Sequence, residues 1–378
     1  MRILILGDPN SPFIQHYVSN FKRVRTTLDQ FDLFGTFRPF RYTEADCFDY
    51  IYHIGPKTEK YITSRWQYFL RILKLWNFLR QFRGKYDIIH VFYAYQDLLF
   101  IYHSLRKFAP KIIITVFGSD FYRLKGTRKL HFKKVFEITT FITFANRQTL
   151  EDFKAHYGEI STLTLCRFGL EPLKYLKNIQ SWSKNDSRKH LLLPEEKIII
   201  CIGYNYDSIQ QHIPILQSIA NTPACKPIKD QLLFIIPMTN GTEEPYRQLL
   251  LQALNEFPFE KVIFERFLSD EEIAHLRKIP DIMIQLQSTD QFSCSMQEHL
   301  FAGNLVITGS WLPYRTFEEQ GIYFRKIDHV RQIGEELVYC INHLDEELAK
   351  CKNNPDAVYT LSSWDSVINS WIKLYQDL

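Results

Sequence analysis

Short apolar runs alternate with longer amphipathic stretches along the first half of the chain. The runs are rich in Ile, Val and Phe and lie at residues 2–6, 88–92, 112–117 and 141–144. Runs of this length are typical of parallel strands that are buried on both faces. Helical periodicity separates them, notably over 64–83 and 147–156. This order of elements predicts a parallel sheet with helices on both faces.

The same alternation starts again after a polar segment at 178–190. Strands are expected at 197–203, 232–237, 262–264, 282–286 and 305–308, and helices at 213–220, 244–256, 270–278 and 296–301. A chain of 378 residues exceeds what one hydrophobic core usually supports. We therefore expect an α/β protein with two Rossmann-like domains whose parallel sheets face a central cleft. The expected division is an N-terminal domain (1–180), a linker (181–195), a C-terminal domain (196–362) and a final helix (363–378) that packs back on the N-terminal domain.

The charge is divided unevenly between the two halves. Residues 1–180 hold 28 Lys and Arg against 15 Asp and Glu, a net +13, whereas residues 181–378 hold 18 against 27, a net −9. A basic half of this kind indicates a large anionic partner, such as a membrane surface, a polyphosphate-linked lipid or a nucleic acid. The basic residues follow no recognised nucleic-acid-binding module, so no nucleic-acid partner is expected.

Two segments carry much of this basic charge. Residues 64–85 combine six basic side chains with a wide apolar stripe, and residues 123–134 form a second basic run. One interpretation is a buried domain helix whose Lys and Arg side chains extend to solvent, together with an ordinary solvated helix. The other is a surface that lies on an anionic bilayer. The sequence leaves both interpretations open.

The most informative group of polar residues lies at 289–303. A strand is expected to end near Leu286, a polar loop follows, and a helix begins near Ser295. The N–H groups and partial positive charge at a helix N-terminus suit a pyrophosphate. Asp290 precedes this helix and Glu298 lies within it, and such carboxylates can accept charge-assisted hydrogen bonds from sugar hydroxyls. The alternative is that the charge near the helix start only complements the helix dipole.

Other strand ends carry weaker signals. Asp120 after Gly118 is either a helix N-cap or an acceptor-side general base. The turn from Gly7 to Asn10 is either a simple connection or a loop that approaches phosphates. His212 is a candidate for phosphate contact because it begins a helix, and His90 is more often a packed strand-end residue than a ligand.

Several function classes are excluded by missing motifs. The sequence has no Gly-x-Gly-x-x-Gly after a strand, no Gly-x4-Gly-Lys-Ser/Thr, and no Asp-x-Asp dyad of the type that holds Mg²⁺ on a nucleotide sugar. It also lacks Cys-x2-Cys and His-x3-His spacing, which argues against a zinc site. The seven cysteines are odd in number and scattered, so we expect reduced structural thiols in a cytosolic setting.

The spacing Asp290-x7-Glu298, followed by Ala302-Gly303 and by Gly309 and Pro313, resembles the Glu-x7-Glu region of GT-B glycosyltransferases of the retaining family 4. The stretch 264–281 and the strand end 201–203 are similar to preceding parts of that family. Residues 203–212 and 236–238 are similar to lipid-linked N-acetylfucosamine transferases, and residues 87–91 and 115–120 resemble the family's N-terminal strand ends.

The resemblance implies a role for each matching residue. Glu298 would bind the nucleotide ribose, Asp290 would hold the transferred sugar, and Asp120 would act on the acceptor side, so these three are the catalytic candidates. The donor-binding candidates are Gly7, Asn10, Gly203, Asn205, His212, Arg266, Phe267, Phe292, Ser293, Cys294, Ser295 and Glu298. Two departures stand out. The first Glu of the motif is Asp290, and the family's Arg and Lys for the diphosphate are absent near 204–205 and 210–211. These departures leave retention and inversion both open.

The expected activity is transfer of a sugar from a nucleoside-diphosphate sugar to a hydroxyl of a lipid-linked saccharide. The N-terminal domain would bind the acceptor and the C-terminal domain the donor. A metal-independent enzyme without a cofactor is expected, which serves polysaccharide or glycoconjugate synthesis. The basic first half of the chain indicates a peripheral location at the cytoplasmic face of the cell membrane. The alternatives are a non-catalytic sugar-nucleotide or membrane-binding protein on the same scaffold, and a sugar-nucleotide epimerase.

Overall fold

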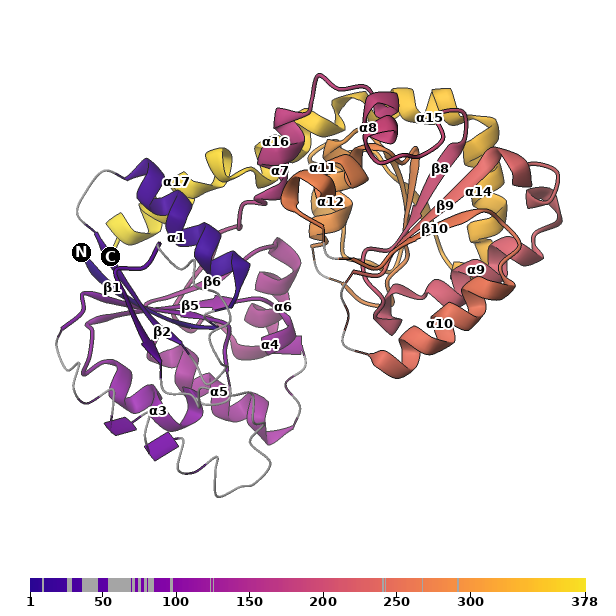
Figure 1. The fold of residues 1–378 in the computed structure, drawn as a ribbon. Coiled ribbons are helices and arrows are strands. Elements are labelled where there is room, and N and C mark those ends of the chain that lie inside the picture. Colours follow the sequence, from indigo (N-terminus) through magenta and orange to yellow (C-terminus); the bar gives the residue numbers. More distant parts are fainter. Residues whose placement is uncertain are drawn as a thin grey trace. The chain divides into compact units, whose positions relative to one another are not determined.

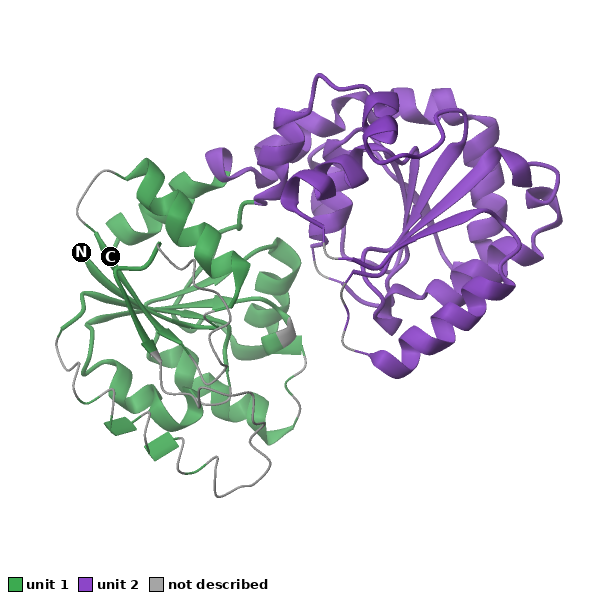
Figure 2. Ribbon diagram, in the orientation of Figure 1, with its two compact units in different colours: residues 1–169, 367–378 green, residues 170–366 purple. Residues whose placement is uncertain are grey.

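The computed structural model describes residues 1–8, 10–25, 29–35, 47–53, 69, 72–73, 76–77, 80, 85–95, 98–122, 124, 126–239, 241, 243–266, 268–290 and 292–378. The chain divides into two compact units, shown in Figure 2. Unit 1 comprises Met1–Gly169 and Val367–Leu378, and unit 2 comprises Leu170–Ser366. Most of the basic segment 64–85 lies outside the described residues.

Unit 1 is built on a seven-stranded parallel sheet of order β3-β2-β1-β4-β5-β6-β7. Figure 1 labels β1, β2, β5 and β6 of this sheet. Its strands are β1 (Arg2–Gly7), β2 (Gln30–Gly35), β3 (Tyr50–His53), β4 (Ile88–Phe92), β5 (Lys111–Val116), β6 (Phe141–Phe144) and β7 (Thr162–Leu165). The apolar runs of the sequence form β1, β4, β5 and β6, and the central strands are buried on both faces as expected.

The helices of unit 1 pack on this sheet through buried aromatic and aliphatic side chains. They are α1 (Pro12–Val24), α3 (Leu98–Leu105), α4 (Ser119–Tyr122), α5 (Thr127–Glu137) and α6 (Arg147–Tyr157). Phe132 and Phe136 of α5 and Phe153 of α6 join one core cluster with β4, β5 and β6. These buried side chains close this part of the sheet to water.

Unit 2 has a six-stranded parallel sheet of order β10-β9-β8-β11-β12-β13. Its strands are β8 (Ile198–Ile202), β9 (Leu232–Pro237), β10 (Lys261–Phe264), β11 (Ile282–Gln285), β12 (Leu305–Gly309) and β13 (Arg325–Ile327). Its α-helices are α7 (Pro172–Asn178), α8 (Lys184–His190), α9 (His212–Asn221), α10 (Glu244–Glu256), α11 (Asp270–Lys278), α12 (Cys294–Phe301), α13 (Arg315–Glu319), α14 (Ile333–Asn342), α15 (Leu344–Lys350) and α16 (Asn354–Ser362). Short 3₁₀ turns lie at Ser208–Gln210, Pro223–Cys225, Lys229–Gln231, Val330–Gln332 and Cys351–Asn353.

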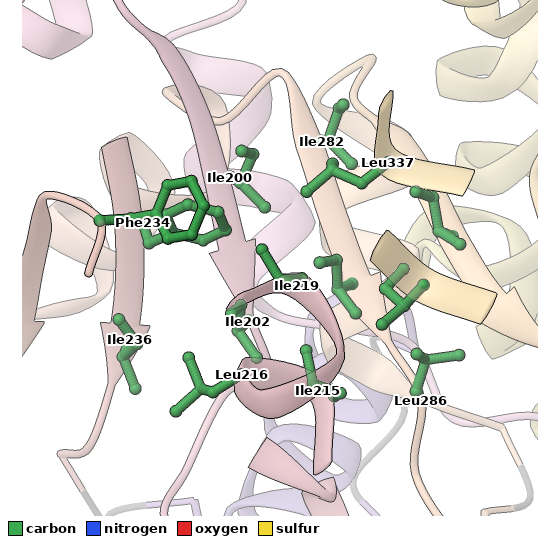
Figure 3. Packing of buried hydrophobic residues seen from close by; sticks show 14 of the residues in the cluster. Ile200, Ile202, Ile215, Leu216, Ile219, Phe234, Ile236, Ile282, Leu286 and Leu337 are labelled. Carbon is green, nitrogen blue, oxygen red and sulfur yellow. The ribbon is translucent and has the colours of Figure 1, made fainter. Parts of the chain in front are cut away.

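Alternate residues of the unit 2 strands point to opposite faces, and each face has its own core. Ile200, Phe234 and Ile282 pack against α9 and α14, as Figure 3 shows for Ile215, Ile219 and Leu337. On the other face, Ile199, Cys201 and Ile235 pack with Leu276 and Ile279 at the end of α11. Both faces are therefore closed to water, which explains why these strands read as nearly continuous apolar runs.

The polar segment that the sequence analysis assigned to a linker (181–195) contains α8 and belongs to unit 2. Ser183 and Asp186 form a capping box at the start of α8. Arg188 is buried, donates to the Asp281 carboxylate over 2.7 Å, and also donates to the Ile279 carbonyl. The division between the units lies instead at Gly169 and Val367.

The last helix, α17 (Trp364–Gln376), contributes its residues from Val367 onward to unit 1. The Trp371 ring contacts Tyr17 and Phe168, and its Nε1 donates to the Arg167 carbonyl over 2.7 Å. The Tyr375 hydroxyl lies 2.6 Å from Nδ1 of His90, which is fully buried in β4. The C-terminus is therefore part of the unit 1 core.

The His90 side chain makes the stability of unit 1 depend on pH. Burial lowers the pKa of His90 to about 3, and its Nε2 lies 2.7 Å from the Thr115 hydroxyl. In the unfolded chain the imidazole takes up a proton near pH 6.5, whereas the folded protein keeps it neutral. The unfolded state thus binds more protons between about pH 6.5 and pH 3, so stability falls as pH is lowered through this range.

We predict that His90→Gln costs less stability at pH 5.5 than at pH 7.5. The wild type loses about 1.4 kcal/mol per pH unit through this group below its unfolded pKa, and the variant does not. Urea unfolding of both proteins at the two pH values measures the difference. An equal difference at both pH values would show that His90 does not titrate on unfolding.

Among the described residues, no helix has the length and hydrophobicity needed to cross a bilayer.

Candidate functional site

The candidate site of unit 2 lies where the strand order changes direction, between β8 and β11. The chain passes from β8 to β9 on one side and from β11 to β12 on the other. Ligands of open α/β sheets bind outside the carboxyl ends of the strands at such a point. Here the two loops are joined directly, because Ser288 N–H donates to the Ile209 carbonyl over 2.9 Å and Gln211 Nε2 to the Leu286 carbonyl over 2.7 Å.

The loop from β8 to α9 brings Gly203, Gln210 and His212 together. Gly203 has φ +64°. A Cβ at this position would lie 2.8 Å from His212 Nε2 and 3.0 Å from Gln210 Oε1. Both ring nitrogens of His212 and Nε2 of Gln210 are buried, with no hydrogen-bond partner among the described residues. Burial lowers the pKa of His212 to about 3, so this group can offer a hydrogen bond but no positive charge near neutral pH.

We predict that Gly203→Ala destabilises the protein more than Gly303→Ala does. Both glycines have positive φ, which costs an alanine roughly 1–2 kcal/mol. Only at position 203 would the new methyl group also meet other atoms within 4 Å. Urea unfolding of the two variants separates backbone strain from this contact, and equal losses would contradict the close packing of Gly203 on His212.

The loop from β11 to α12 ends in a well-capped helix. Ser293 is the N-cap, and its hydroxyl accepts from the Met296 N–H over 3.1 Å and from Gln285 Nε2 over 3.2 Å. The eight residues of α12 are all buried except Cys294, which is half-buried. The Ser295 hydroxyl is buried without a partner among the described residues. The first N–H groups of a helix have no intrahelical acceptor, so this terminus suits an anion.

Asp290 and Glu298 lie on either side of this helix start, and each is held by a side chain from another element. Asp290 is half-buried, and its Oδ2 accepts from the Tyr314 hydroxyl over 2.5 Å. Glu298 is 6% exposed, and its Oε2 accepts from Arg277 Nε over 2.7 Å. Both carboxylates are recognisable in the sequence but neither partner is, because Tyr314 and Arg277 are 24 and 21 residues away and follow no local pattern.

Other expected donor-binding residues of unit 2 have protein partners. Asn205 exchanges hydrogen bonds with Asp207, and Arg266 pairs with both oxygens of Glu272. The Phe292 ring stacks on Phe317 with centroids 4.6 Å apart. Burial and the charges of Glu298 and Asp290 raise the pKa of the Cys294 thiol, which makes it a poor nucleophile. Phe267 lies outside the described residues.

The expected residues of unit 1 also lie at carboxyl strand ends. Gly7 ends β1, and a Cβ there would lie 2.4 Å from Ile14 Cδ1. The Asn10 N–H donates to Asp8 Oδ1 over 3.0 Å. The Asp120 carboxylate is 4% exposed and accepts N–H bonds from Ala94 and Gly118 at 2.8 and 2.7 Å.

Asp120 therefore joins the loops after β4 and β5. Burial raises its pKa to about 6, although the backbone N–H groups act in the opposite direction. Such a carboxylate changes its charge near neutral pH, which is the property a general base needs. Its two backbone bonds equally support a role in fixing the loop that carries Tyr93, a non-glycine residue at φ +79°.

No group of three or more His, Cys, Asp or Glu that could hold a metal ion occurs in the part of the chain that the structure describes.

Part of unit 1 matches a known protein family, and the whole chain is similar to solved structures. Residues 2–146 match the model of the family described as "Glycosyl transferase 4-like". A comparison with curated proteins found no match. Among solved structures, sucrose-phosphate synthase from Thermosynechococcus elongatus is similar over 100% of this chain and 98% of its own, with 14% identity and a TM-score of 0.77.

Two further structures are similar at the same level. HepE of Anabaena, in complex with UDP and glucose, has 13% identity, a TM-score of 0.73 and 100% coverage of both chains. A glycosyltransferase from Rickettsia africae has 13% identity, a TM-score of 0.73 and coverage of 100% of this chain and 98% of its own. Similarity at identities this low establishes the fold alone. The family match covers part of unit 1. The chain thus has the GT-B fold, and its residues 2–146 match the glycosyl transferase 4-like family, which together support a transferase enzyme.

Proposed function

We propose that the protein transfers a sugar from a nucleoside-diphosphate sugar to a hydroxyl group, with unit 2 binding the donor. The observation that carries this proposal is the pair of carboxylates, Asp290 and Glu298, on either side of the α12 N-terminus at the β8/β11 switch point. A diphosphate is bound by N–H donors. The ribose and the transferred sugar are bound by groups that accept hydrogen bonds from their hydroxyls. This loop offers both within one short segment.

In this proposal each side chain has a defined task. Asp290 accepts from hydroxyls of the transferred sugar, and Glu298 accepts from the ribose hydroxyls. The N–H groups from Phe292 to Ser295 bind the diphosphate, and the neutral His212 adds a hydrogen bond. HepE has been solved with UDP-glucose, so UDP is the first nucleotide to test. No cofactor or metal ion is required in this scheme.

For the acceptor we propose a lipid-linked saccharide that is bound by unit 1 at an anionic membrane face. Exposed basic side chains on α5, in the described part of the basic run 123–134, support binding to an anionic membrane. Arg128, Lys133 and Lys134 on α5 are exposed, and Leu130 on the same helix is 67% exposed. Basic residues near an anionic bilayer contribute about 1 kcal/mol each. Co-sedimentation with phosphatidylserine vesicles tests the idea, and equal binding to neutral vesicles would refute it.

Thermal unfolding in the presence of UDP, GDP, TDP and CMP tests the donor site. A nucleotide at 100 times its dissociation constant stabilises by roughly 2.7 kcal/mol, so the correct base raises the unfolding temperature clearly. The matching nucleotide sugar should then release its nucleoside diphosphate when the protein is added, with EDTA present or absent. If no nucleotide stabilises the protein, the proposed donor site is wrong.

A second candidate function is binding without catalysis. The side chains nearest to Gly203 in the β8–α9 loop are uncharged at neutral pH, namely Gln210 and His212. A leaving diphosphate is usually stabilised by positive charge, and these groups supply none. The release of nucleoside diphosphate over hours separates the two candidates, because a binding protein would be stabilised by a nucleotide and release nothing.

A further inference from the structure

We propose that Tyr314 is a positioning residue that fixes the Asp290 carboxylate for contact with the transferred sugar. This inference rests on the proposed function, since Asp290 is the residue assigned to that sugar. It adds a residue from outside the Asp290–Glu298 segment and gives the hydroxyl of Tyr314 a task.

The contact is direct and comes from a neighbouring loop. Tyr314 follows β12, and Asp290 follows β11, the strand that pairs with β12. The Tyr314 hydroxyl donates to Asp290 Oδ2 over 2.5 Å. Tyr314 is 2% exposed, whereas Asp290 is half-buried. The tyrosine is therefore a fixed internal donor, and the carboxylate it holds reaches the surface of the site.

In the bond to the Asp290 carboxylate, the Tyr314 hydroxyl is the donor. Burial and the charge of Asp290 raise the pKa of Tyr314 well above its usual value, so the phenol stays protonated at every working pH. A hydrogen bond from a neutral hydroxyl to a carboxylate is short and directional. It restricts the orientations that the carboxylate can take before a sugar binds.

The loops themselves are fixed by other contacts. Trp311 Nε1 donates to the Gln287 carbonyl over 2.8 Å, and Thr308 Oγ1 donates to the Gln285 carbonyl over 2.9 Å. The Tyr314 ring also lies against Phe317, with centroids 5.4 Å apart. Loss of the hydroxyl alone should therefore leave the backbone in place and remove one contact of the Asp290 carboxylate.

Tyr314→Phe tests this separation. We expect kcat for release of nucleoside diphosphate to fall about 10- to 100-fold, because a small misplacement of a reacting group has effects of this size. The dissociation constant for the nucleotide without its sugar should stay within twofold. The probe is UDP with UDP-glucose, or the corresponding pair for whichever nucleotide stabilises the protein.

The matched control is Tyr323→Phe. The Tyr323 hydroxyl also donates to a carboxylate of unit 2, Glu347 Oε2 on α15, over 2.6 Å. This variant removes the same kind of bond and should keep the wild-type kcat. A double-variant cycle completes the test, since Tyr314→Phe should have no further effect on kcat when Asp290 is already Ala.

The outcomes separate this inference from the proposed function. If the wild type turns over and Tyr314→Phe turns over equally well, the positioning role is wrong while the transferase assignment stands. If the variant loses nucleotide affinity as much as kcat, the hydroxyl supports the loop as a whole and the inference is again wrong. If the wild type releases no nucleoside diphosphate from any donor that binds, the proposed function fails, and the inference fails with it.

Discussion

Glu298→Ala should lower the free energy of unfolding by about 3–5 kcal/mol and abolish measurable donor binding. The Glu298 and Arg277 side chains are 7% and 10% exposed, and their contact of 2.7 Å joins α12 to α11. Without the carboxylate, the guanidinium remains buried with an uncompensated charge. Its Nη1 already has no partner among the described residues. Urea unfolding measures the loss of stability.

Glu298→Gln separates the binding role of this residue from its structural role. The amide oxygen can still accept from Arg277 Nε, so the protein should remain folded at room temperature. A charge-assisted hydrogen bond to the ribose is worth about 1.5–3 kcal/mol, so the dissociation constant for the nucleotide should rise about 10- to 100-fold. Calorimetric titration with the stabilising nucleotide measures this change.

A second buried ion pair serves as the control. Asp281 accepts from Arg188 Nη2 over 2.7 Å and from the Ile199 N–H over 3.0 Å, so Asp281→Asn weakens a comparable pair of unit 2. We expect this variant to lose stability and keep its nucleotide affinity. A folded Glu298→Gln protein with wild-type affinity would show that Glu298 is only the structural partner of Arg277.

The elements that the sequence predicted well have local signals at their ends. The bounds expected for α10 and α11 agree with the structure. Pro245 stands in the first turn of α10, and Ser269 with Glu272 forms a capping box on α11. These signals act within a few residues, so they can be recognised without knowledge of the fold.

The strand β2 was not predicted because its stability depends on a distant partner. Asp32 interrupts its apolar pattern, yet this carboxylate is fully buried and accepts from the Tyr86 hydroxyl over 2.7 Å. The two residues are 54 positions apart. In the same way, the polar composition of 181–195 suggested a linker. The segment is instead packed on unit 2, where Arg188 is buried and paired with Asp281. Long-range pairs of polar groups leave no periodic signal in a sequence.

The candidate site shows the same division between local and distant information. The spacing of Asp290 and Glu298 and the helix start between them are local, and the structure contains a capped helix there. The partners of the two carboxylates come from the loop after β12 and from α11. A tyrosine after Pro313 or an arginine within an amphipathic helix has no distinguishing spacing. Only the parallel order of the strands brings them to the site.

The second large effect on stability is expected from a substitution in the C-terminal helix α17. Trp371→Ala should destabilise unit 1 by about 3–5 kcal/mol, because the indole is fully buried and removing it leaves a cavity. The Tyr17 and Phe168 rings would lose a contact at about 5 Å, and the Arg167 carbonyl would lose its donor. Urea unfolding, together with limited proteolysis of the C-terminal segment, measures the effect.

Trp182→Ala is the control for Trp371→Ala, because Trp182 is 40% exposed and contacts His275 within unit 2. We expect it to lose far less stability and to keep its C-terminus resistant to protease. Residues 367–378 belong to unit 1 together with residues 1–169, although they follow the whole of unit 2 in the chain. Unit 1 therefore completes its core only when residues 367–378 have been made and have packed on α1. A Trp371→Ala protein with wild-type stability would contradict this dependence of unit 1 on α17.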